Sequence, residues 1–144
     1  MRKVLISMIL VLLLSSCSHL YTAVPYVISG EMKLNDKGEG DLSSFDFTFK
    51  NCGNKEIFSF TVSFFLFDED DTPVLNGNPK VTCIIREDIP SGDILESSFS
   101  LDSFLNYIPE TPYKIEYLYV KKIIYSDGTE WEDVLGLKAM KEGL

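Results

Sequence analysis

Few side chains in this sequence are suited to nucleophilic or metal chemistry. His19 is the only histidine, and it lies two residues beyond Cys17, the first of three cysteines. One imidazole is too few for a multi-histidine metal centre, and its place beside Cys17 does not suit a catalytic triad. Cys52 has no histidine nearby to activate it, and none of the 22 acidic residues forms a pair singled out by its surroundings. We therefore expect a protein that is not an enzyme and that uses no cofactor.

The densest acidic cluster is the run DEDD at residues 68–71. Its carboxylates offer the hard oxygen ligands that Ca²⁺ prefers. The weak metal-ligand candidates are Asp68, Asp70 and Asp71. An EF-hand loop beginning at Asp68 would place Pro73 where the loop needs glycine and Pro79 where it needs a bidentate glutamate. We favour a solvated turn that protects a sheet edge, and keep a small-ligand or cation-binding module as the alternative function.

The N-terminus reads as an export signal. Arg2 and Lys3 precede the charge-free run from Val4 to Leu14, which is too short to span a bilayer. A basic start, a short apolar run and small residues after it are typical of a secretory signal. We therefore predict a signal peptide at residues 1–16.

The residues that follow this run, Leu14-Ser15-Ser16-Cys17, resemble the bacterial lipobox. The resemblance implies that the Cys17 sulfur carries a diacylglyceryl group, that cleavage occurs before Cys17, and that the new amino group is commonly acylated. Two or three acyl chains would anchor the protein stably in a membrane. Ser18 is compatible with export to an outer membrane, because Asp is the usual inner-membrane retention signal at this place. The expected location is therefore the cell envelope, with the outer membrane preferred.

The mature chain is acidic and of single-domain size. Residues 1–16 carry two basic residues and no acidic one, so the remaining 11 basic and 22 acidic residues give a formal net charge of −11, against −9 for the whole chain. Such a surface repels nucleic acid, so we expect no nucleic-acid partner. The ten Phe and seven Tyr argue for a packed core rather than disorder.

Beyond a lipidated tether at residues 17–25, the chain alternates between short strands and turn signals. The predicted strands are Tyr26 to Leu34, Leu42 to Lys50, Ile57 to Phe67, Lys80 to Arg86, Ile94 to Leu101, Tyr113 to Tyr125 and Thr129 to Val134. Seven short strands with almost no helix favour an antiparallel β-sandwich at residues 26–134. Residues 135–144 form a tail for which a strand end, a helical turn and a frayed end all stay open. Asp102 is expected to cap a helical turn over Ser103 to Tyr107.

Two details of register follow from the pattern. A two-residue Asp127-Gly128 hairpin places Ile124 opposite Trp131. In the long strand, Phe58, Phe60, Val62, Phe64 and Leu66 are expected to share the core face.

The stretch Phe64 to Asp68 (FFLFD) resembles the motif of the FxLYD family of small extracytoplasmic bacterial domains. The residues that match are Phe64, Leu66 and Asp68, and Phe67 stands where the family has Tyr. The turns at 51–53 and 89–92 sit where such domains have similar turns, so the likeness spans roughly 26–134. The resemblance implies an immunoglobulin-like sandwich, frequent in lipoproteins, and gives no catalytic residues.

Aromatic residues offer a candidate interaction surface, since Tyr is enriched in interfaces; packing of tyrosines in a half-buried strand is the competing interpretation. The candidates are Ile57, Phe65, Phe67, Tyr117 and Tyr119. The leading hypothesis is a non-catalytic, membrane-anchored lipoprotein, a protein-binding or structural envelope module whose partners are the membrane, through its lipid, and another envelope protein.

Cys52 and Cys83 are predicted to be free thiols. Pairing Phe67 with Lys80 places Cys83 opposite Phe64, about 23 Å along the sheet from the start of that strand, where Cys52 lies. A disulfide tolerates Cα atoms no more than about 7 Å apart.

Overall fold

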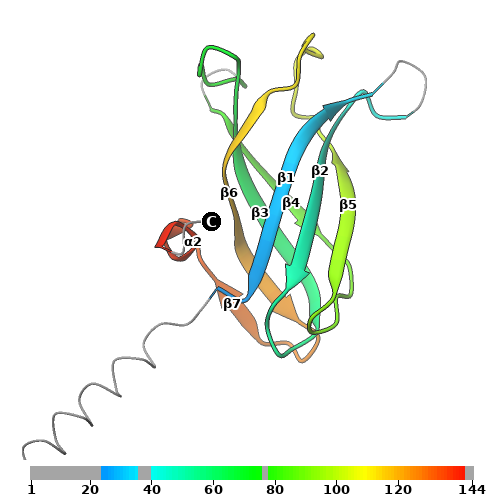
Figure 1. The fold of residues 1–144 in the computed structure, drawn as a ribbon, viewed down its shortest axis with the longest axis vertical. Coiled ribbons are helices and arrows are strands. Elements are labelled where there is room, and N and C mark those ends of the chain that lie inside the picture. Colours follow the sequence, from blue (N-terminus) through cyan, green and yellow to red (C-terminus); the bar gives the residue numbers. More distant parts are fainter. Residues whose placement is uncertain (1–23, 36–39, 76–77, 142–144) are drawn as a thin grey trace, which may run out of the picture.

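The chain folds into two facing antiparallel sheets (Figure 1). The computed structural model describes residues 24–35, 40–75 and 78–141. One sheet has the order β1-β2-β5 and the other β4-β3-β6-β7. The strands are β1 Tyr26–Leu34, β2 Ser43–Asn51, β3 Ile57–Phe67, β4 Lys80–Ile85, β5 Ile94–Ser100, β6 Lys114–Tyr125 and β7 Glu130–Glu132, followed by the helix α2 Leu137–Lys141. The predicted seven-stranded all-β sandwich is confirmed; the signal peptide at 1–16, Cys17 and most of the tether lie outside the described residues.

Phenylalanines from both sheets fill the core. The alternating Phe45, Phe47 and Phe49 of β2 are all buried. Phe49 stacks on Phe60 of β3 with ring centroids 4.2 Å apart, and Phe45 meets Phe64 at 4.5 Å. Aromatic pairs at such distances stabilise a fold beyond the effect of the area that they bury, so these stacked rings help to hold the two sheets together.

The long strand β3 does not keep one alternation along its whole length. Its pairing with β6 shifts register between Ile57 and Ser59. The first two side chains of the strand therefore point to the faces opposite to those predicted. Ile57 is fully buried and exchanges backbone hydrogen bonds with Ile89 (3.0 and 2.9 Å). Phe58 is exposed instead, so the prediction that Phe58 faces the core is wrong. From Phe60 onward the predicted alternation holds.

The hairpin between β6 and β7 has a three-residue loop. Gly128 N–H donates to the Tyr125 carbonyl at 2.9 Å, and Gly128 has a φ of 82°. A tight turn followed by a glycine in this conformation adds one residue to the loop. Trp131 therefore lies opposite Ile123, and the predicted pairing of Trp131 with Ile124 is wrong by one position.

The pairing of β3 with β4 is shifted by two residues from the predicted register. Phe67 bridges to Pro73 within the turn, so Lys80 pairs with Phe65 rather than with Phe67. Cys83 consequently lies opposite Val62. The shift is two residues, which leaves every side chain on its predicted face.

Asp102 does not cap a helix. Its carboxylate accepts hydrogen bonds from Leu42 N–H (2.8 Å), Ser43 N–H (2.7 Å) and the Ser43 hydroxyl (2.7 Å), and these bonds hold the pKa of Asp102 below its usual range. Residues 103–107 form turns rather than a helix. Among the described residues, a short helix lies instead in the C-terminal tail, as α2.

Candidate functional site

A groove of about 430 Å³ lies on the outer face of the four-stranded sheet. Its lining comes from β3, the start of β4, β6 and the segment that follows β7. The lining residues are Phe65, Phe67, Pro79, Lys80, Tyr117, Tyr119, Leu135 and Met140. We call this feature the aromatic groove, because four of its eight residues are Phe or Tyr.

An irregularity in β6 turns Tyr117 outward. The β3–β6 pairing jumps from Ser63 opposite Tyr119 to Phe65 opposite Glu116, and Tyr117 adopts a positive φ of 53°. Tyr117 is 60% exposed, and its ring meets Phe65 edge-on at 5.8 Å. A positive φ is unfavourable for a residue with a bulky side chain. The fold therefore holds Tyr117 against its own backbone preference, at the rim of the groove.

Tyr119 forms the floor of the groove and attaches the C-terminal segment to the sheet. It is 6% exposed, and its hydroxyl donates to the Val134 carbonyl at 3.2 Å. Gly136 lies directly over the ring, where an added Cβ would come within 3.0 Å of a ring carbon. Lys80 Nζ reaches the Tyr119 hydroxyl at 3.4 Å. Tyr119 is thus a supporting residue more than a contact residue.

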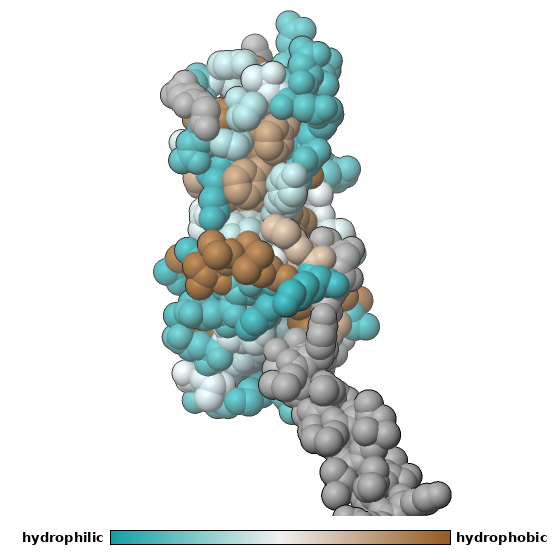
Figure 2. Space-filling view, turned by 90° about the vertical axis from the view of Figure 1, so that its left-hand side faces the viewer, coloured by the Kyte–Doolittle hydropathy of each residue, from teal (hydrophilic) through white to brown (hydrophobic). Residues whose placement is uncertain are grey.

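The C-terminal segment forms one wall of the groove. The carboxylate of the buried Asp133 accepts hydrogen bonds from Lys138 N–H (2.9 Å) and Ala139 N–H (3.1 Å), which fixes the first turn of α2. Outside this support stand four apolar side chains, which we call the ridge. They are Val134, Leu135, Leu137 and Met140, with exposures of 51, 68, 55 and 56%. Figure 2 shows this face, where strongly hydrophobic side chains gather at mid-height beneath an area of weaker hydrophobicity.

Four of the five residues predicted as an interaction surface meet in the groove: Phe65, Phe67, Tyr117 and Tyr119. Ile57 does not, because the register shift at the start of β3 buries it completely. The ridge residues Leu135 and Met140 were missed. The tail carries no strand pattern, so nothing in the sequence indicated that it returns to cover β6.

The carboxylates of Asp68, Glu69 and Asp71 in the acidic turn bind other groups of the protein. Asp68 Oδ1 accepts from Asp70 N–H (3.0 Å) and Thr72 N–H (2.8 Å), and Asp71 pairs with Lys114 Nζ at 2.7 Å. Glu69 accepts from the Thr111 hydroxyl at 2.7 Å. Among residues 24–35, 40–75 and 78–141, no three His, Cys, Asp or Glu side chains are placed so that they could hold one metal ion.

Both described cysteines are free thiols. Cys52 is exposed beside the turn that follows β2, and Cys83 is buried in the core. Burial raises the pKa of the Cys83 thiol to about 12, so almost none of it is the reactive thiolate at neutral pH. The prediction of free thiols agrees with this arrangement.

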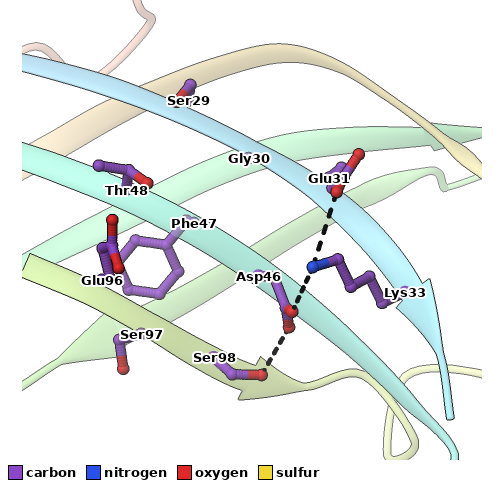
Figure 3. A pocket seen from close by; sticks show the side chains of 10 residues that line it. All are labelled: Ser29, Gly30, Glu31, Lys33, Asp46, Phe47, Thr48, Glu96, Ser97 and Ser98. Carbon is purple, nitrogen blue, oxygen red and sulfur yellow. Dashed lines mark hydrogen bonds and ion pairs between the residues drawn. The ribbon is translucent and has the colours of Figure 1, made fainter.

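A second hollow, of about 610 Å³, lies on the outer face of the other sheet (Figure 3). Its polar groups bind one another: Lys33 pairs with Asp46 at 3.2 Å and with Glu31 at 3.7 Å. Asp46 also accepts from the hydroxyls of Ser44 and Ser98, and the Ser44 hydrogen bond is the main cause of its lowered pKa. These groups are satisfied within the sheet, so this hollow is a weaker candidate than the aromatic groove.

Comparison with known proteins gives the fold and little more. No protein-family model and no curated protein match the chain. A 1.85 Å crystal structure of a hypothetical protein from Peptoclostridium difficile 630 is similar, with a TM-score of 0.58 and 11% identity over 83% of this chain and 91% of that one. At this identity the likeness concerns the fold alone. In the described part of the chain, no helix is long and apolar enough to cross a membrane.

Proposed function

We propose that this chain is a lipid-anchored, non-catalytic module of the bacterial cell envelope, and that its aromatic groove binds another envelope protein. The proposal has two separable parts, the anchor at Cys17 and the binding site on the four-stranded sheet. Each has its own support and its own test.

The anchor rests on the sequence Leu14-Ser15-Ser16-Cys17 after an eleven-residue charge-free run. The lipobox resemblance supplies the chemistry, in which the thiolate of Cys17 is the nucleophile that takes up the diacylglyceryl group. The FxLYD resemblance agrees with this placement, since such domains are frequent in lipoproteins. Ser18 favours the outer membrane over the inner one.

The binding function rests on one observation, the aromatic groove itself. Aromatic residues and Met are enriched in protein interfaces, and the groove combines Phe, Tyr and Met with one cation, Lys80. Tyr117 presents a large, rigid, largely exposed ring, the kind of side chain that anchors an interface. The expected partner carries an apolar side chain for the groove and an acidic group for Lys80.

Mass spectrometry tests the anchor. The N-terminal peptide of the mature protein should begin at Cys17 and carry acyl mass. An unmodified peptide that begins elsewhere would refute the anchor.

Site-specific photocrosslinking in intact cells tests the groove. A benzophenone amino acid at Tyr117 should give a discrete adduct with one envelope protein. Tyr107 is the matched control, because it is also an exposed tyrosine (70%) but lies outside the groove. Equal adduct patterns from both positions, or none from Tyr117, would contradict a binding groove.

A further inference from the structure

The ridge is an unusual concentration of exposed apolar surface. Four large apolar side chains within residues 134–140 each expose more than half of their surface. They belong to a short segment whose backbone is held by hydrogen bonds to Asp133 and Tyr119, and this backbone keeps the four side chains exposed to solvent. Exposed apolar side chains gathered on one face mark an interaction site or a membrane contact.

The start of β1, which the tether precedes in sequence, lies close to the ridge. Tyr26, at the start of β1, packs edge-on against Trp131 with ring centroids 5.7 Å apart. Lys138 of α2 lies over the same indole, 5.0 Å from its centroid. One side chain, Trp131, therefore contacts both the first strand and the helix of the ridge. Figure 1 shows the start of β1 beside β7, with α2 on the same side of the sandwich.

The tether is too short to carry the domain away from a membrane. Six residues separate Cys17 from Val24, the first described residue, and the seven steps from Cys17 to Val24 span at most about 25 Å when the chain is extended. A lipid at Cys17 thus holds the ridge within reach of the headgroups.

The charge of the ridge segment suits a lipid surface, although the domain as a whole is acidic. Residues 134–141 contain two lysines, Lys138 and Lys141, and no acidic residue, while Asp133 and Glu142 are their acidic neighbours in sequence. Asp133, just before them, is buried and bound to α2 backbone. Apolar side chains flanked by lysines are typical of segments that lie in the membrane interface, and a lysine near an anionic surface contributes about 1 kcal/mol.

We propose that the ridge is a second membrane contact, in which Val134, Leu137 and their neighbours enter the headgroup region of the bilayer that holds the Cys17 lipid. This inference rests on the anchor of the proposed function. Leu135 and Met140 also line the aromatic groove, so the groove would open beside the bilayer. A protein that binds in the groove would therefore bind at the membrane surface.

The test uses the full mature lipidated chain, reconstituted in vesicles of phosphatidylglycerol and bromine-labelled phosphatidylcholine. In a Cys52→Ser background, Leu137→Cys carries a polarity-sensitive nitrobenzoxadiazole dye; Cys83 stays unlabelled because it is buried. Ile94→Cys is the matched control, since Ile94 is similarly exposed (60%, against 55% for Leu137) but lies on β5 of the other sheet. The dye at position 137 should shift to shorter wavelength and be quenched by the bromine labels, while the dye at position 94 should stay in water.

Two further variants measure the contact. Leu135→Ser should lower the ratio of bilayer-contacting to water-exposed dye at position 137 about tenfold, the effect of one apolar side chain. Lys141→Gln should lower the same ratio about fivefold at low salt, and less when salt screens the surface.

The outcomes separate the two proposals. A chain without acyl mass refutes the anchor of the proposed function. A lipidated chain whose dye at position 137 stays in water, or is quenched no more than the dye at position 94, overturns the ridge contact while the anchor stands. A dye at position 137 that leaves water only when an envelope protein is added also overturns it, because a protein then covers the ridge.

Discussion

Asn51→Asp should destabilise the domain strongly, although it exchanges a single side-chain group of the same shape. Asn51 is fully buried at the end of β2, and its Nδ2 donates to the carbonyls of Lys55 (2.8 Å), Ile89 (2.9 Å) and Pro90 (3.2 Å). Its Oδ1 accepts from Gly53 N–H at 3.0 Å. One amide thus joins the turn after β2 to the turn before β5. A carboxylate has the same shape but donates nothing when ionised, and it would face three acceptors.

The magnitude follows from the three donated bonds. At about 1 kcal/mol net for each, their loss costs about 3 kcal/mol, and the buried charge adds to this. For a domain of this size the urea midpoint should fall by about 1–3 M, with an unchanged slope. Burial should raise the pKa of the introduced carboxyl above its unfolded value near 4, so the loss should shrink as the pH is lowered toward about 4 and the group becomes a donor.

Asn35→Asp is the control, because Asn35 Nδ2 makes one exposed hydrogen bond, to the Asp41 carbonyl at 2.9 Å. Its substitution should cost less than about 1 kcal/mol. If urea unfolding gives the same loss for both variants, the role assigned to Asn51 is refuted.

Three further predictions concern the ridge, the cysteines and acid stability. Gly136→Ala should lower the free energy of unfolding by about 1–2 kcal/mol, because Gly136 has a φ of 71° and lies on the Tyr119 ring. Trypsin should then cut faster within α2, and an unchanged rate of cleavage would contradict the contact between Gly136 and Tyr119. Cys52 should react quickly with iodoacetamide in the native protein and Cys83 only after denaturation, both without reductant, whereas a failure of both to react would indicate a disulfide. Because the Ser44 hydrogen bond lowers the pKa of Asp46, that carboxylate contributes stability that is present above about pH 4 and lost as the pH falls through the lowered pKa. Asp46→Asn should make the urea midpoint less dependent on pH in that range, and an unaltered pH profile would count against it.

The sequence was most informative where a strand has one wet face and one buried face. The alternation of Phe45, Phe47 and Phe49 with polar residues is typical of a strand with one buried face, and the bounds of β1 and β3 were predicted to the residue. It was least informative where backbone irregularities decide which way a side chain points. The shift at the start of β3 that exposes Phe58 depends on pairing with β6, a partner distant in sequence. The extra loop residue at Gly128 depends on turn geometry that Asp-Gly does not specify uniquely.

The candidate site divides in the same way. Phe65 and Phe67 could be found because they place large apolar groups on the face opposite the predicted core, and Tyr117 because Tyr is enriched in interfaces. The opposite wall, with Leu135 and Met140, required knowledge that residues 133–141 fold back over Tyr119, and that path is set by tertiary contacts such as the Tyr119 hydroxyl bond to Val134.

The order of strands has a consequence for how the chain acquires this structure. β2 pairs with β5 and β3 pairs with β6, so each sheet is completed by residues far along the chain, as in the 52-residue separation of Asp46 and Ser98. Such non-local pairing makes folding slow, on the scale of milliseconds to seconds. Until β6 has been synthesised, the central strand β3 can pair only with β4 in its sheet, and its other edge stays open to neighbouring chains. Before then, that open edge is a place at which the chain is prone to aggregate, and the arrival of residues 114–125 removes the hazard.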